Sequence, residues 1–104
     1  MKKKVYNKLV RDRIPEVLTN KEIKFSTHVA DEKEYLEKLH EKLVEEVAEF
    51  VEDPCIEEII DIFEVLDVLR NVYDYKFEDL KLERKRKRIS RGGFNDKIIL
   101  EWTK

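Results

Sequence analysis

The sequence predicts a mainly α-helical protein, built as an antiparallel helical bundle with short extended segments near the termini. The chain has 104 residues, of which 44% are charged and 41% hydrophobic, and only 2 are Gly and 2 are Pro. Because these turn-forming residues are scarce, the composition favours long amphipathic helices over a β-sandwich or barrel. The length fits one domain, residues 1–104, and a chain this small often gains stability by pairing with a copy of itself. We therefore expect a homo-oligomer, either a dimer or a tetramer.

The first elements along the chain are expected to be short. Residues 3–10 are irregular or extended, and Pro15, whose fixed φ suits a first helical turn, predicts a short helix that stops near Asn20. Residues 23–29 then alternate apolar and polar side chains, which is the pattern of a short β-strand.

A long helix is predicted from Asp31 to about Glu52. Asp31 can cap its N-terminus, and Glu34 three residues later completes a capping-box pattern. One face carries an apolar stripe at helical spacing, formed by Leu36, Leu39, Leu43, Val47 and Phe50. Glu46 and Glu49 lie along the edge of this stripe, where core meets solvent, and an unpaired carboxylate is costly at such a position.

Two further long helices are predicted. Pro54 suits the first turn of a helix that reaches about Tyr75, with an apolar face of Ile62, Val65, Leu69 and Val72. Other apolar residues cover much of its remaining circumference, so we expect this helix at the centre of the domain or of a dimer interface. Residues 77–90 form a highly charged helix that ends before Gly92-Gly93, and residues 97–103 are expected to be extended and able to pair with another extended segment.

The compartment is predicted from the cysteine count and from hydropathy. Cys55 is the single cysteine, so no internal disulfide can form, and the basic start of the chain is followed by no apolar run that would serve as a signal peptide or membrane span. We expect a soluble, cytoplasmic protein with no membrane partner.

Two acidic pairs lie symmetrically about the turn between the first two long helices. Glu46 and Glu49 precede Asp53-Pro54, and Glu58 and Asp61 follow it at matching distances. In an antiparallel hairpin Glu49 would face Glu58 and Glu46 would face Asp61, and converging carboxylates repel one another unless a cation lies among them. Oxygen ligands select Mg²⁺, or Mn²⁺, over zinc. The same residues are equally typical of solvated helix faces, and the pattern alone does not separate the two interpretations.

Charge is segregated along the chain although the net charge is only -2. Residues 31–67 hold fifteen acidic and three basic residues, whereas residues 1–24 hold eight basic against three acidic and residues 81–91 hold seven against one. An acidic middle that collects a divalent cation, between basic ends that collect phosphates, suits a metal-bound polyphosphate better than a nucleic-acid duplex.

Three motifs, spread over nearly the whole chain, carry a resemblance to one enzyme superfamily. Glu45-Glu46-x-x-Glu49 followed by Glu58-x-x-Asp61 resembles the EExxE...ExxD signature of the all-α NTP pyrophosphatases, the MazG-like superfamily. Residues 7–16 (NKLVRDRIPE) and 91–94 (RGGF) are similar to its small, stand-alone phosphoribosyl-ATP pyrophosphohydrolase-like branch. The eight residues between Glu49 and Glu58 favour that branch over MazG proper. The absence of a Tyr-His pair after Asp61 argues against the substrate of histidine synthesis.

The resemblance implies Mg²⁺-dependent hydrolysis of a nucleoside triphosphate between its α- and β-phosphates, with house-cleaning of non-canonical nucleotides as one role. It implies that Glu46, Glu49, Glu58 and Asp61 hold the metal. Glu45 is a candidate general base, although on a helix it lies about 100° from Glu46 and can equally face solvent. The candidate phosphate-binding residues are Lys8, Arg11, Arg13, Lys42 and Arg91. Of these, Arg11 and Arg91 are favoured because the motifs retain them, while Lys42 can instead pair with Glu46.

Two other classes of function stay open. The basic stretch of residues 81–91 is compatible with a nucleic-acid-binding module, although the dense acidic half of the chain disfavours it. A helical interaction protein without catalysis would leave its acidic pairs facing solvent and gain no stability from Mg²⁺.

Overall fold

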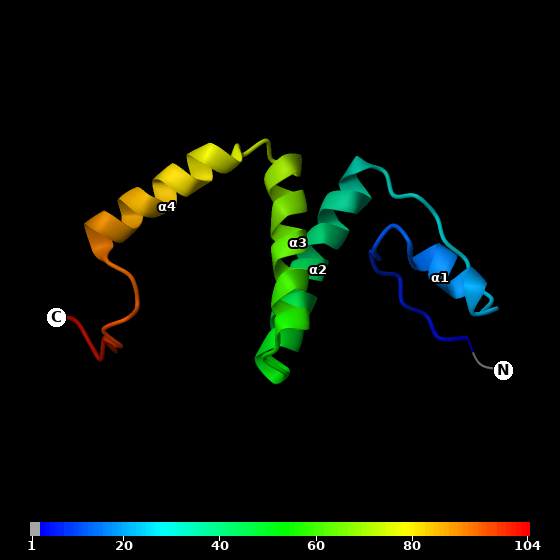
Figure 1. Cartoon of the computed structure of the whole chain (residues 1–104), viewed down its shortest axis with the longest axis horizontal. Coiled ribbons are helices and arrows are strands. Elements are labelled where there is room, and N and C mark those ends of the chain that lie inside the picture. Colours follow the sequence, from blue (N-terminus) through cyan, green and yellow to red (C-terminus); the bar gives the residue numbers. More distant parts are fainter. Residues whose placement is uncertain (1–2) are drawn as a thin grey trace.

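The computed structural model describes residues 3–104, and all of its regular structure is helical. The helices are α1 (Ile14–Asn20), α2 (Glu32–Glu52), α3 (Ile56–Val72) and α4 (Phe77–Arg91). The prediction of a mainly α-helical fold is therefore confirmed. Helices α2 and α3 form a central hairpin, α1 lies to one side of it, and α4 projects away on the other (Figure 1). No helix within residues 3–104 combines the length and apolar character needed to cross a bilayer.

The predicted strand at residues 23–29 is wrong, because residues 3–104 contain no β-strand. Residues 97–103 form neither a helix nor a strand. The prediction that they are not helical is correct, but within residues 3–104 they do not pair with another extended segment. A single extended segment is not stable as a strand unless a neighbour supplies the other half of each hydrogen-bond ladder. Val29 illustrates the point, since 98% of its surface is exposed and no described part of the chain covers it.

The long helix α2 forms as its sequence predicts. The Asp31 side chain accepts a hydrogen bond of 2.8 Å from the backbone N–H of Glu34, which satisfies one of the free donors at the helix start. Leu39 lies at the middle of the apolar stripe and is 2% exposed. It packs with Val65 and Leu69 of α3 to form the buried core, against which Leu9 of the N-terminal segment also packs.

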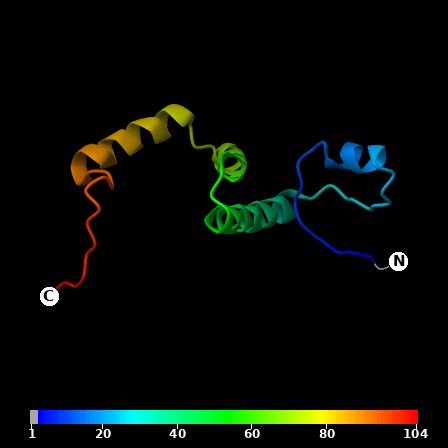
Figure 2. The ribbon, with the colours of Figure 1, turned by 60° about the horizontal axis from the view of Figure 1, so that its bottom comes forward.

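Helix α3 is shorter at both ends than expected. It begins at Ile56 with Cys55 as its N-cap, so Pro54 lies in the turn before it and not in its first turn. It ends at Val72, and Asp74 adopts a left-handed conformation with φ 58° that takes the chain out of the helix. In Figure 2 α3 is seen nearly end-on while α2 runs across the view, so the two helices cross at an inclination.

The α4 helix ends where the glycines predict. Gly92 has φ 82°, a conformation that residues with a Cβ rarely adopt, and its N–H bonds to the Arg88 carbonyl. Every residue of α4 is exposed. In Figure 1 it extends away from the hairpin, so α4 and the residues after it form an arm that lies outside the core.

Candidate metal centre

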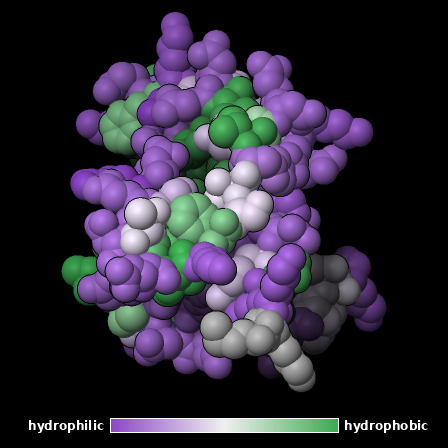
Figure 3. Space-filling view, turned by 90° about the vertical axis from the view of Figure 1, so that its right-hand side faces the viewer, coloured by the Kyte–Doolittle hydropathy of each residue, from purple (hydrophilic) through white to green (hydrophobic). Residues whose placement is uncertain are grey.

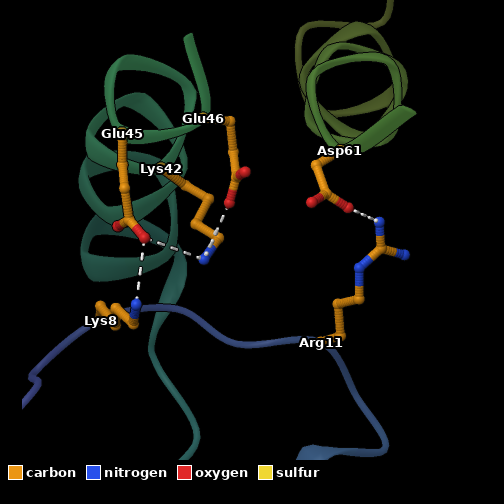
Figure 4. Close-up of polar contacts among 6 residues, drawn as sticks. All are labelled: Lys8, Arg11, Lys42, Glu45, Glu46 and Asp61. Carbon is orange, nitrogen blue, oxygen red and sulfur yellow. Dashed lines mark hydrogen bonds and ion pairs between the residues drawn. The ribbon is translucent and has the colours of Figure 1, made fainter. Parts of the chain in front are cut away.

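Glu46 is the buried acidic residue at the centre of the hairpin. Its position at the edge of the apolar stripe of α2 turns it toward α3, and only 5% of its surface is exposed. In Figure 4 the side chains of Glu46 on α2 and Asp61 on α3 lie on the facing sides of the two helices, and both extend toward the N-terminal segment that runs beneath them. Burial of this kind distinguishes Glu46 from a charge on a solvated helix face.

Carboxylates gather around Glu46 in two overlapping groups. Glu46 lies with Glu58 and Asp61 of α3 in one group, and with Glu45 and Glu49 of its own helix in the other, with one ligand oxygen from each member within 4.8 Å of the others. The expected pairing of Glu46 with Asp61 is present. Glu49, which was expected to face Glu58, instead groups with Glu45 and Glu46 and is exposed. The inclined crossing of the helices and the late start of α3 explain why Glu46 meets both α3 carboxylates.

Two carboxylate oxygens in this cluster are buried without a hydrogen-bond partner: Oε2 of Glu46 and Oε2 of Glu58. Buried polar atoms in proteins nearly always have a partner, and leaving one unpaired costs about 1–3 kcal/mol, more for a charged group. Both residues belong to the group of Glu46, Glu58 and Asp61, whose ligand oxygens lie within 4.8 Å of one another, so the unpaired oxygens favour a cation site over a solvated helix face. A cation bound between them would satisfy both oxygens at once.

Three basic residues surround the cluster. Nζ of Lys42 lies 3.2 Å from Oε1 of Glu46 and 3.6 Å from Oε1 of Glu45. From the N-terminal segment, Lys8 donates a 3.0 Å hydrogen bond to the same Glu45 oxygen. Arg11 donates a 2.7 Å hydrogen bond to Oδ1 of Asp61 on α3 (Figure 4). Lys8 and Arg11 thus connect the N-terminal segment to both helices of the hairpin.

These contacts shift the titration of two neighbouring glutamates in opposite directions. Burial raises the pKa of Glu46, and repulsion from Glu49 and Asp61 adds to it, against the opposing pull of Lys42. Burial would also raise the pKa of Glu45, but the hydrogen bond from Lys8 and the charge of Lys42 outweigh it, so that this pKa is lowered. The pKa values of Lys8 and Arg11 are raised, first by their hydrogen bonds to Glu45 and Asp61 respectively.

The donor set and the charge balance fit Mg²⁺. Five carboxylates, from Glu45, Glu46, Glu49, Glu58 and Asp61, face three cations, which leaves two negative charges in excess when all are ionised. One divalent cation neutralises that excess. Oxygens around a single Mg²⁺ ion lie about 3–4 Å apart, so small side-chain rotations within the 4.8 Å clusters suffice to bring them to that spacing.

The structure leaves two of the predicted phosphate-binding residues away from this cluster. Arg13 forms a bidentate pair with Glu16 on α1, at 3.0 and 3.1 Å, and its side chain is largely exposed. Arg91 ends α4, the helix that projects from the hairpin, where it lines a surface depression with residues 92–99. Within one chain, therefore, Lys8, Arg11 and Lys42 meet the acidic cluster, and Arg13 and Arg91 do not.

The sequence did not indicate that Glu45 would bind the side chains of Lys8 and Lys42. Lys8 and Glu45 are 37 residues apart, and Arg11 and Asp61 are 50 apart. No local periodicity links such positions. The one sequence signal that relates to them is Leu9, the apolar residue between Lys8 and Val10, because its packing on the core brings the flanking basic side chains to the hairpin.

No family model, curated protein or solved structure matches this chain, so its resemblance to the MazG-like superfamily stays a prediction.

The burial of Glu46 gives a stability prediction. Its pKa is higher in the folded than in the unfolded protein, so in the metal-free protein the stability that protonated Glu46 contributes is lost as the pH rises from about 4.5 through the folded-state pKa. Glu46→Gln removes that loss, and Lys42 keeps Glu45 as a partner. We expect Glu46→Gln to be about 1 kcal/mol more stable than wild type at pH 7 in chelator, by urea unfolding.

The matched control is Glu37→Gln, which changes an exposed glutamate on the same helix. The gain from Glu46→Gln should shrink toward pH 4.5, whereas Glu37→Gln should follow wild type at both pH values. Equal stability of the two variants at pH 7 would contradict the assignment of an unfavourable buried charge to Glu46.

Proposed function

We propose that this protein is a Mg²⁺-dependent nucleoside triphosphate pyrophosphohydrolase, which cleaves the bond between the α- and β-phosphates to give a nucleoside monophosphate and pyrophosphate. The observation that carries the proposal is the pair of buried, unpartnered carboxylate oxygens of Glu46 on α2 and Glu58 on α3. The order and spacing of the acidic motifs, which resemble those of the all-α NTP pyrophosphatases, supply the reaction type.

The metal would be held by Glu46, Glu58 and Asp61, with Glu49 at the more exposed end of the cluster. When bound there, Mg²⁺ would neutralise charge on the triphosphate and, as a Lewis acid, would polarise a phosphoryl oxygen on the phosphorus that is attacked. Glu46 and Glu58 fix the position of that charge, because both are anchored on rigid helices that share one core.

The basic residues supply positive charge to the substrate phosphates. Lys8, Arg11 and Lys42 are ion-paired with the cluster carboxylates, and Arg11 retains an accessible side chain with 56% exposure. A guanidinium carries five N–H donors, so Arg11 can hold Asp61 and still donate to a phosphate. In this arrangement the carboxylates position the cations, and the cations bind the anionic substrate.

Glu45 meets one requirement of a general base and not another. Its lowered pKa keeps it ionised and able to accept a proton at neutral pH, but the same shift makes it a weak base. Its two lysine contacts give it a positioning role in addition, because it holds Lys8 and Lys42 beside the cluster.

The test of the proposed activity is a panel of ribo-, deoxyribo- and damaged nucleoside triphosphates incubated with Mg²⁺, with pyrophosphate and orthophosphate measured separately. We expect pyrophosphate and monophosphate in equal amounts from at least one member, and none in chelator. Orthophosphate alone would show cleavage at a different bond. If no member reacts, a helical interaction protein becomes the better interpretation.

Arg11 is the basic residue whose loss should most affect substrate binding. Removing a charge-assisted hydrogen bond to a phosphate costs about 1.5–3 kcal/mol, so Arg11→Gln should raise KM for the best triphosphate by roughly tenfold or more. Steady-state kinetics at saturating Mg²⁺ measure this change. Lys24→Gln, at an exposed position with the same change in net charge, is the control. A KM unchanged in Arg11→Gln would limit Arg11 to a structural role.

A further inference from the structure

The isolated chain exposes far more surface than a folded protein of its size. Its accessible surface is 10422 Å², whereas a compact monomer of this mass exposes about 6,200 Å². The radius of gyration is 18.6 Å, against about 13 Å for a compact chain of this length. Only three hydrophobic residues among those the structure describes, Leu39, Val65 and Leu69, are buried.

Both helices of the hairpin carry an apolar stripe that no described part of the chain covers. On α3, Ile56 is 74% exposed and Phe63 is 62% exposed, and they lie at helical spacing with Ile60 and Leu66. On α2 the corresponding exposed stripe consists of Val44, Val47 and Val51. Figure 3, seen from the α1 side, shows hydrophobic side chains reaching the surface between hydrophilic ones. Helix α3 was expected to be buried on more than one side, and one chain buries only one.

The arm, residues 77–104, has the complementary properties. Its exposed apolar residues are Phe77, Leu80, Leu82, Ile89, Phe94, Ile98, Ile99, Leu100 and Trp102. Residues 81–91 within it have seven basic residues against one acidic, whereas residues 31–67, which span most of α2 and α3, have fifteen acidic against three basic. Arm and hairpin therefore match each other in both apolar character and charge.

The link between α3 and α4 is held on the hairpin by side-chain contacts. The Tyr73 hydroxyl and Nε2 of His40 on α2 are 2.8 Å apart and share a hydrogen bond, and the rings of Tyr73 and Tyr75 stack at 5.5 Å. Arg70 donates a 3.2 Å hydrogen bond to the Tyr75 carbonyl. These contacts hold the chain on the hairpin as far as Tyr75, and beyond that point α4 projects away from the hairpin with its apolar side chains exposed (Figure 1).

We propose that two copies of this chain form a dimer by exchanging arms, with the arm of each chain packed on the exposed stripes of α2 and α3 of the other. A second copy of the chain carries both matching surfaces, the arm and the hairpin. In a two-fold symmetric dimer each arm therefore packs on the hairpin of the other chain. The excess surface is about 4,000 Å² per chain by the compact-monomer estimate, or about 8,000 Å² for two chains, which is more than enough for the roughly 2,000–5,000 Å² in total that obligate dimers commonly bury. The exchange also brings the basic helix, with Arg91 at its end, onto the acidic face of the partner.

The first test is the mass of the full chain in solution, measured by size-exclusion chromatography with light scattering. We expect about twice the chain mass of 12.6 kDa at micromolar concentration. Phe63→Asp should raise the dimer dissociation constant by about 100-fold, because it places a charge at the centre of the α3 stripe. Val29→Asp changes a 98% exposed apolar residue in the linker before α2 and should leave the dimer intact.

The second test uses the unmodified sequence and so does not depend on the folding of a variant. Equal amounts of ¹⁴N- and ¹⁵N-labelled chain are refolded together and treated with a zero-length amine-to-carboxyl cross-linker. About half of the cross-links between arm lysines and carboxylates of residues 31–67 should join a light to a heavy peptide. A monomeric mass, or arm–hairpin cross-links that are all isotopically pure, would overturn the proposal. A monomeric protein that binds single-stranded RNA through its arm would also overturn the proposal. None of these outcomes depends on the proposed hydrolase activity.

Discussion

Glu46→Gln should lower the Mg²⁺-dependent release of pyrophosphate by at least about 1000-fold, which corresponds to about 4 kcal/mol of transition-state stabilisation. Glutamine keeps the shape of the side chain and removes the charge that a divalent cation requires. Because Glu46 belongs to both carboxylate groups of the hairpin, its change disrupts the whole cluster and not one edge of it. The measurement is kcat/KM for the best triphosphate of the panel, at saturating Mg²⁺.

A control variant separates this effect from a general loss of negative charge. Glu37→Gln lies on the same helix, is exposed, and should retain the wild-type rate within about twofold. Glu58→Gln, which removes the partner of Glu46 on α3, should behave as Glu46→Gln does. Wild-type activity in Glu46→Gln would exclude the cluster between α2 and α3 as the catalytic centre.

Mg²⁺ should stabilise the wild-type protein strongly, because it relieves the repulsion between carboxylates that the fold brings together. At a hundredfold excess over its dissociation constant, a ligand that binds only the folded state adds about 2.7 kcal/mol to the free energy of unfolding. For a domain of this size that is an increase in Tm of about 10 °C or more. Thermal unfolding followed by circular dichroism, at one fixed protein concentration, measures it.

Adding Mg²⁺ should reverse the order of stability of wild type and Glu46→Gln. In chelator Glu46→Gln should be the more stable protein, because wild type carries the buried charge, whereas in Mg²⁺ wild type should be the more stable. Replacing Mg²⁺ with K⁺ at equal ionic strength controls for screening of the acidic surface. A Tm that rises equally in wild type and Glu46→Gln would indicate screening and no specific site.

Local patterns were sufficient to predict most of the fold. The cap formed by Asp31 and the apolar spacing around Leu39 defined α2 within one residue, because helix ends and helix faces depend on neighbours three or four positions away. The strand at residues 23–29 was wrong for the opposite reason. Alternation shows only that a segment can pair, whereas a strand exists only when a distant segment supplies the partner.

The candidate site was predictable in its members and less so in its arrangement. The symmetry about Asp53-Pro54 placed Glu46 near Asp61, but the inclination between α2 and α3 is set by side-chain packing along the whole contact, so the displacement of Glu49 could not be read from spacing. Nor could spacing reveal that Glu46 is 5% exposed. The unpaired oxygens, which distinguish a cation site from a charged surface, emerge only from the packed structure.

Binding of a divalent cation between α2 and α3 is measured most directly by titrating the metal-free protein with Mn²⁺ and following the free ion by electron paramagnetic resonance. We expect saturable binding that Mg²⁺ displaces, that persists in Glu37→Gln, and that is lost in Glu46→Gln. If the ion does not bind to wild type, or binds equally to Glu46→Gln, the buried carboxylates of Glu46 and Glu58 are not a metal centre, and the proposed Mg²⁺-dependent hydrolysis between α2 and α3 is contradicted.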